Sequence, residues 1–228
     1  MKSGAVRMRG MLNRLVVLAV VGSLVCGATQ VEAATRKARP TPSLGTRIAS
    51  RASKLVGVKN LRTVDKSVPD DCTGVARHAY TSVGIDVMAG TPIAGANGVT
   101  HIYRYARQRG ALHKKQPRPG DLVFFRETHD RNGDGRKNDG LTHVAVVESV
   151  SKSGLVTFVH RGSRGVARSR MFLAEPHVHR LPGSKEVLND YLRRGARGEK
   201  GRLTGELFVG FASPGPLAKS APKAVARR

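Results

Sequence analysis

The segment LTHVAVVESVSKSGLVTFVHR (141–161) predicts a β-hairpin at the centre of the fold. Its two halves are rich in Val, Phe and Thr, and the polar run SKSG separates them, which is typical of antiparallel strands joined by a short turn. A two- or four-residue loop pairs Val150 with Leu155, and this register puts His143 and His160 on the same face, one diagonal step apart. A three- or five-residue loop would turn one imidazole to the far face.

Two more apolar runs predict strands, GDLVFFR (120–126) and ELFVGFA (206–212). Upstream of them, apolar residues at helical spacing, with caps and glycine stops, predict three helices over 44–56, 71–82 and 97–110. Helices followed by strands with short connections favour an α+β fold. We expect N-terminal helices packed on a central antiparallel sheet.

The N-terminal region predicts export. Four basic residues precede the apolar run LVVLAVVGSLVCGAT (15–29), which is too short to span a bilayer, and Val31 and Ala33 stand where a signal peptidase reads. We therefore expect a signal peptide over 1–33, rather than an uncleaved anchor, and no stable membrane span after its removal. The other predicted regions are a basic linker (34–43), a single globular domain (44–212) and a disordered basic tail (213–228).

The charge is strongly positive, with 40 Lys and Arg against 16 Asp and Glu and a formal charge of +24. Loss of the four bases and Glu32 with the signal peptide would leave about +21. This surplus predicts attraction to an anionic polymer of the cell envelope, although a solvated basic surface explains it equally well. Few aromatic residues, no binding motif and an export signal disfavour nucleic acid as a partner.

Cys72 is a candidate nucleophile. Cys26 falls in the predicted signal peptide, so the exported chain would hold one cysteine and no internal disulfide. With Asp70 or Asp71 as N-cap, Cys72 begins a helix, where backbone N–H groups and the dipole would lower the thiol pKa and stabilise an oxyanion. The hairpin would then supply a base from its imidazole pair.

Four motifs, DDCTG, RPGDLVFF, THVAVVESV and VTFVHRGSRGV, occur in this order across about residues 50–165. Together they resemble the NlpC/P60 family of cell-wall peptidases, a compact papain-like superfamily that also includes CHAP amidases. The resemblance implies a papain-like core with Cys72 as nucleophile, His143 as base and His160 as the residue that orients it. It also implies hydrolysis of peptide bonds in peptidoglycan stem peptides, with no cofactor required.

The chain departs from the family in two places. The tyrosine and Gly-Gly pair common upstream of the cysteine are missing, and the segment 164–207 is longer and more basic than the family core requires. Substrate preference is therefore open, and two alternatives remain. One is a CHAP-type amidase that cuts the sugar–peptide bond, and the other is a non-catalytic wall-binding protein on the same scaffold.

The loop DRNGDGRKNDG (130–140) resembles the first half of a calcium loop, with Asp130, Asn132 and Asp134 followed by a glycine. Position twelve is Leu141 instead of a bidentate Glu, so Asp139 or Asn138 would have to substitute. The alternative is a polar hairpin loop whose residues were selected for turn formation. Zinc is not expected, because the sequence has no cluster of His and Cys.

Overall fold

A computed structural model describes residues 41–219 except 93, 137 and 196–197. The predicted signal peptide, most of the predicted linker and residues 220–228 of the predicted tail lie outside this range.

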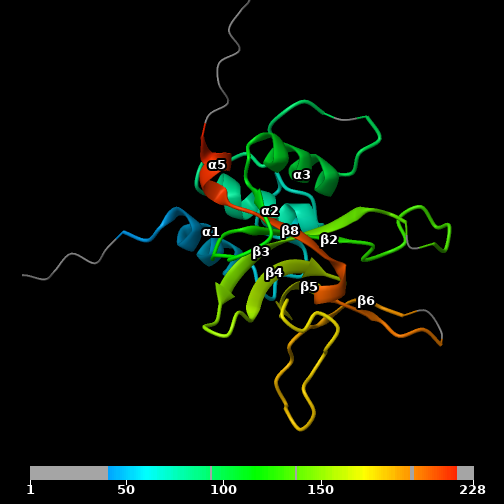
Figure 1. The fold of residues 1–228 in the computed structure, drawn as a ribbon. Coiled ribbons are helices and arrows are strands. Elements are labelled where there is room, and N and C mark those ends of the chain that lie inside the picture. The colour runs from blue at the N-terminus through cyan, green and yellow to red at the C-terminus, as the bar shows by residue number, and fades with distance from the viewer. Residues whose placement is uncertain (1–40, 93, 137, 196–197, 220–228) are drawn as a thin grey trace, which may run out of the picture. The chain divides into compact units, whose positions relative to one another are not determined.

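The fold is α+β, as predicted, with an antiparallel six-stranded sheet in the order β1-β8-β2-β3-β4-β5 (Figure 1). Its strands are β1 (Leu112–His113), β2 (Leu122–Arg126), β3 (Leu141–Val150), β4 (Val156–Gly162), β5 (Gly165–Met171) and β8 (Phe208–Ala212). A separate two-stranded sheet pairs β6 (Tyr191–Arg193) with β7 (Arg202–Leu203).

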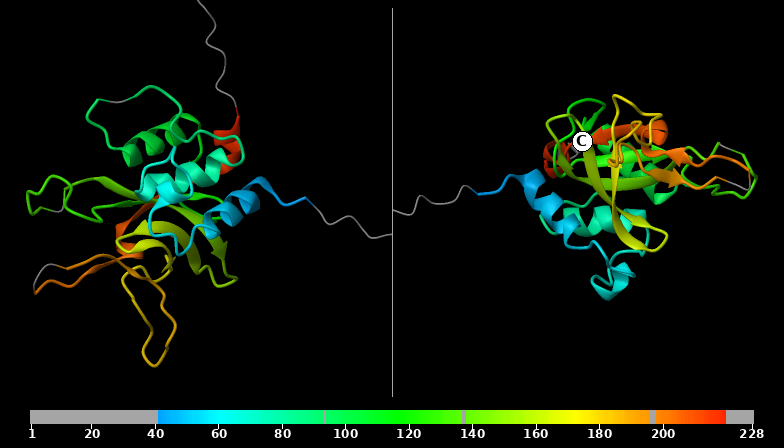
Figure 2. Two further views of the ribbon diagram at one scale, coloured as in Figure 1. Left: turned by 180° about the vertical axis from the view of Figure 1, so that it is seen from behind. Right: turned by 90° about the horizontal axis from the view of Figure 1, so that it is seen from below.

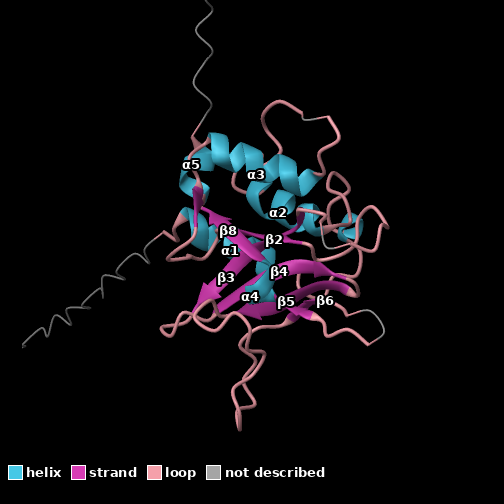
Figure 3. Ribbon diagram, turned by 45° about the vertical axis from the view of Figure 1, so that its right-hand side comes forward, coloured by secondary structure: helices cyan, strands magenta, loops and turns pink. Residues whose placement is uncertain are grey.

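The three predicted helices are present and lie on one side of the sheet (Figure 3). They are α1 (Leu44–Ser53), α2 (Cys72–Thr81) and α3 (Gly98–Gln108), with side-chain N-caps at Ser43, Asp71 and Asn97. Shorter elements are the 3-10 helix η1 (Leu61–Thr63) and the helices α4 (Thr204–Leu207) and α5 (Pro214–Ala218). Within the described residues, none of the helices combines the length and apolar character needed to cross a membrane.

The sheet separates two apolar clusters, as strand alternation requires. Residues such as Phe124 and Val144 face the helices and pack in one cluster with the buried positions of α1, α2 and α3. Their neighbours Phe125 and Ala145 belong to the second cluster, on the opposite face. The β3–β4 hairpin is thus buried on both sides, which explains its nearly continuous apolar sequence.

The hairpin loop is one residue longer than predicted. Val150 pairs with Val156 rather than with Leu155, so the loop covers five residues, 151–155. A β-bulge at Glu148 then inserts one extra residue into β3, and Val146 pairs with Val159, the register predicted from the shorter loop. The prediction was wrong at the turn, yet the expected side of the sheet for both histidines is preserved.

Two further boundaries differ from the sequence prediction. Residues 206–207, expected to begin a strand, belong to α4, and β8 starts at Phe208. The disordered tail was expected to begin at residue 213, but residues 214–218 form α5, in which Pro214 and Leu217 are buried. Proline at the first helical position and burial of Leu217 explain why this segment is ordered.

Candidate active site

Cys72 occupies the first position of α2, and the two aspartates before it have separate tasks. The Asp71 carboxylate caps the helix by accepting hydrogen bonds from the backbone N–H groups of Thr73 and Gly74, at 2.8 and 3.1 Å. Asp70 instead forms a two-bond ion pair with Arg161, in which Nε and Nη2 each lie 2.9 Å from a carboxylate oxygen. The helix start is therefore tied to the end of β4.

The Asp70–Arg161 pair was not predicted from the sequence, although Arg161 directly follows His160. Asp70 also accepts the backbone N–H of Leu61 at 2.9 Å, and these contacts lower its pKa to about 2. Because Arg161 also donates to the Lys59 carbonyl, at 3.1 Å, three segments meet beside the helix start. This network fixes the position of Cys72 relative to the histidine strand.

The two hairpin histidines form a buried pair, as the register predicted. His143 Nε2 lies 3.0 Å from His160 Nδ1, and the side chains are 8% and 7% exposed. The other nitrogen of His160, Nε2, lies 3.1 Å from the Ser169 hydroxyl on β5. Both imidazoles contact Phe125 or Phe158, on the sheet face away from the helices.

The thiol lies beside the start of β3, the strand that carries His143. Cys72 packs against the helix-side cluster, and its Sγ lies 4.0 Å from the carbonyl oxygen of Thr142, the residue before His143. Since Nε2 of His143 faces His160, its Nδ1 is the ring nitrogen that does not take part in the histidine pair. The three predicted residues thus lie in one region, near the start of β3.

Desolvation favours the neutral form of all three groups, of which Cys72 is partly buried and the two histidines are buried. It raises the pKa of Cys72 to about 11, the opposite of the lowering expected from the helix N-terminus. Burial also lowers the pKa of His160 to about 4, and burial together with the neighbouring His160 holds that of His143 well below its ordinary 6.5. The expected helix effect was overestimated because the sulfur is desolvated and Asp71 lies nearby.

The expectation that several backbone N–H groups at the helix start would stabilise an oxyanion needs correction. Asp71 already takes the N–H groups of Thr73 and Gly74, so in the described part of the chain the Cys72 N–H is the first-turn donor left for an oxyanion. Gly74 is required by the packing of the helix start. A Cβ there would lie 2.0 Å from the Pro69 carbonyl oxygen, so its role is close packing of the preceding loop.

The acidic loop directs its side chains inward to its own backbone. Asp130 accepts the N–H groups of Gly133 and Gly135, at 2.8 and 2.7 Å, and Asp139 accepts that of Arg131. Asn132 donates to the Asp134 carboxylate at 3.0 Å. Among the described residues, no three His, Cys, Asp or Glu side chains are grouped to hold a metal.

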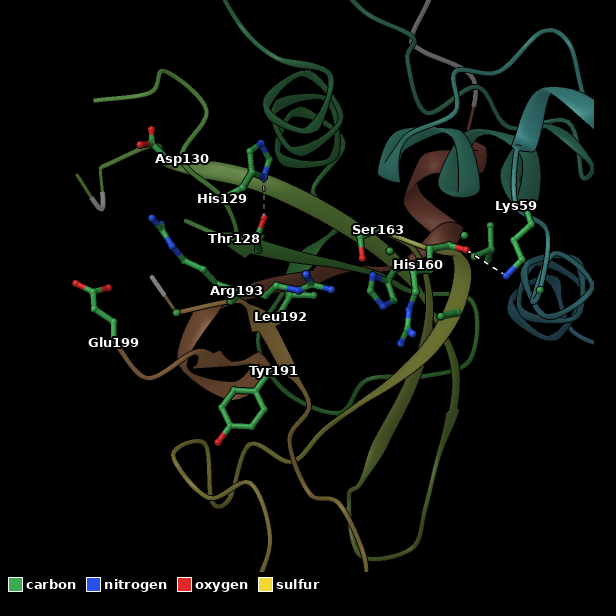
Figure 4. A pocket seen from close by; sticks show the side chains of 18 of the residues that line it. Lys59, Thr128, His129, Asp130, His160, Ser163, Tyr191, Leu192, Arg193 and Glu199 are labelled. Carbon is green, nitrogen blue, oxygen red and sulfur yellow. Dashed lines mark hydrogen bonds between the residues drawn. The ribbon is translucent and has the colours of Figure 1, made fainter. Parts of the chain in front are cut away.

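A cavity of about 930 Å³ borders His160 (Figure 4). The acidic loop, the β4–β5 turn and the β6–β7 hairpin line it, whereas Cys72 and His143 do not. Figures 1 and 2 show that loop and that hairpin projecting from the same end of the molecule. No sequence pattern predicted this cavity, since the hairpin strands are short and basic.

Residues 63–162 match the family of the CHAP domain, and this interval contains Cys72, His143 and His160. The resemblance to the NlpC/P60 and CHAP group is therefore confirmed. A solved structure described as "Structure of NlpC1 from Trichomonas vaginalis" aligns over 57% of this chain with 21% identity and a TM-score of 0.32. The alignment spans 40% of that protein's length. No curated protein matches the sequence.

Proposed function

We propose that the protein is an exported cysteine peptidase that hydrolyses amide bonds in peptidoglycan stem peptides. Cys72 is the nucleophile, His143 the general base, and His160 the residue that positions His143. The observation that carries this proposal is the His143–His160 hydrogen bond of 3.0 Å at the strand end where Cys72 Sγ also lies. The CHAP match supports both the reaction class and an extracytoplasmic peptidoglycan substrate.

The neutral groups favour proton transfer during attack instead of a preformed ion pair. In the tautomer that this mechanism requires, His143 Nε2–H donates to His160 Nδ1 and His160 Nε2–H donates to the Ser169 hydroxyl, which leaves a lone pair on His143 Nδ1. As Cys72 Sγ bonds to the carbonyl carbon, its proton moves to His143 Nδ1. His143 then protonates the leaving amine, and it later activates the water that hydrolyses the thioester. The mechanism requires no cofactor.

Digestion of purified sacculi tests the proposal. We expect soluble fragments from the unaltered protein, a loss of at least about 1,000-fold in Cys72→Ala, and complete block by a thiol alkylator. Lys152→Gln, a change in the exposed β3–β4 loop, is the control and should digest at the unaltered rate. If the unaltered protein binds sacculi as Cys72→Ala does and releases no fragment, the protein is a wall-binding module.

The CHAP match favours a second candidate, an amidase that cuts the bond between sugar and peptide. Mass spectrometry of the released fragments separates the two activities. A peptidase leaves part of the stem on the glycan, whereas an amidase releases the intact stem.

A further inference from the structure

The cavity beside His160 is built mainly from segments outside the CHAP match. One wall, the loop 128–135, lies inside the match. The others, the β4–β5 turn around Arg164 and the described part of the β6–β7 hairpin, lie outside it. A volume of about 930 Å³ is at the upper end of the range for small-ligand pockets, so the cavity can hold a short peptide segment. His160 is the member of the histidine pair that lines it.

The lining of the cavity contains more basic than acidic side chains. Its bases are Lys59, Arg164, Arg193 and Arg194. Two acids, Asp130 and Glu199, also line the cavity, against these four bases. Asp130 accepts two backbone N–H groups of its own loop, and Glu199 has interactions of its own. The net charge of the lining is therefore positive.

Two of these cations are held toward the cavity by neutral contacts. Arg193 is partly buried and donates from Nη1 to the Glu127 carbonyl at 3.0 Å, which orients the guanidinium without neutralising it. Lys59 Nζ lies 3.4 Å from the Arg164 carbonyl oxygen, which brings Lys59 to the β4–β5 turn. Figure 4 shows Lys59 and His160 on one side, and Asp130 and Arg193 toward the other. An oriented guanidinium suits a carboxylate, which it can bind with two parallel hydrogen bonds.

We propose that this cavity binds a carboxylate-bearing part of the peptide substrate, and that Arg164 and Arg193 select for it. The inference rests on the proposed function, because His160 connects the cavity to the candidate catalytic residues. Selection by charge would make a free stem carboxylate a requirement for tight binding. Conversion of that carboxylate to a carboxamide would then weaken binding.

Binding without turnover tests the inference. In a Cys72→Ala background, titration calorimetry compares a synthetic stem tetrapeptide with the same peptide in which its carboxylates are carboxamides. We expect the acid to bind about tenfold more tightly. Adding Arg164→Gln or Arg193→Gln should weaken acid binding about tenfold and leave amide binding unchanged. Arg104→Gln, on the exposed side of α3, removes the same charge outside the cavity and should change neither affinity.

Equal affinity for acid and amide, or equal effects of Arg104→Gln and the two cavity variants, would overturn the inference. If Arg193→Gln fails to fold because the Glu127 contact is lost, Arg164→Gln decides alone. Cleavage by the unaltered protein separates this inference from the proposed function. Cleavage with no preference for the acid overturns the inference and leaves the function standing. Acid-selective binding with no cleavage supports the cavity and overturns the peptidase.

Discussion

The helix-covered face of the sheet and the opposite face contribute different halves of the candidate site. On the first, Cys72 is desolvated and its pKa is raised to about 11. On the second, desolvation lowers the pKa of both His143 and His160. One physical cause thus moves acid and base pKa values in opposite directions, and it leaves every group uncharged. Under the proposed mechanism, the proton is therefore transferred during attack rather than before the substrate arrives.

The largest expected effect concerns the thiol side. The rate of Cys72 alkylation by iodoacetamide should rise about tenfold per pH unit, or about 1,000-fold from pH 7 to pH 10, because the thiolate fraction grows until the pKa of about 11. Peptide-resolved mass spectrometry measures the rate at this residue. A rate that is flat between pH 7 and pH 9 would show a preformed thiolate–imidazolium pair and contradict the comparison.

The next effect concerns the imidazole side. His160→Ala removes the acceptor that orients His143, and kcat/KM should fall about 10- to 100-fold. His160→Asn restores a carbonyl oxygen near that acceptor position, so it should recover part of the loss. Cys72 alkylation at pH 9 should be unchanged in both variants. If kcat/KM of the His160→Asn variant is no higher than that of His160→Ala while both variants remain folded, His160 does not act through His143.

The smallest expected effect is on stability and concerns the helix start between the two faces. Gly74→Ala forces a Cβ against the Pro69 carbonyl, so the free energy of unfolding should fall by about 1–3 kcal/mol. Gly215→Ala is the matched control, because its Cβ meets no atom within 4 Å. Urea unfolding measures the change in the free energy of unfolding for both variants. Equal changes would mean that the loop before Cys72 moves to accommodate the added Cβ.

The central hairpin and the three helices could be predicted because their signals are local. Apolar runs and capping residues lie within each element, as at Asp71 and Asn97, and the histidine pair follows from strand alternation. The burial of Cys72 could not be predicted in the same way, because desolvation depends on β3 and the loop before α2. The motif around a cysteine predicts that it begins a helix, but it does not predict how strongly the thiol is desolvated.

The segment after β4 was the least predictable. The strand β5 contains alternating arginines on its exposed side, and β6 and β7 are three and two residues long, below the length at which periodicity is visible. The Asp70–Arg161 pair joins residues 91 positions apart, which no local pattern reveals. Long-range contacts of this kind shape the cavity and anchor the helix start.

The bulge at Glu148 separates the length of the β3–β4 turn from the placement of the imidazoles. Its extra residue is fastened on both sides, by a two-bond ion pair to Arg168 and by a hydrogen bond from Ser53. One extra residue in the turn does not change which face of the sheet His143 and His160 occupy. The bulge restores the register between the turn and His143. We therefore expect the turn to accept a change of one residue in length as long as the Glu148 carboxylate keeps the bulge in place.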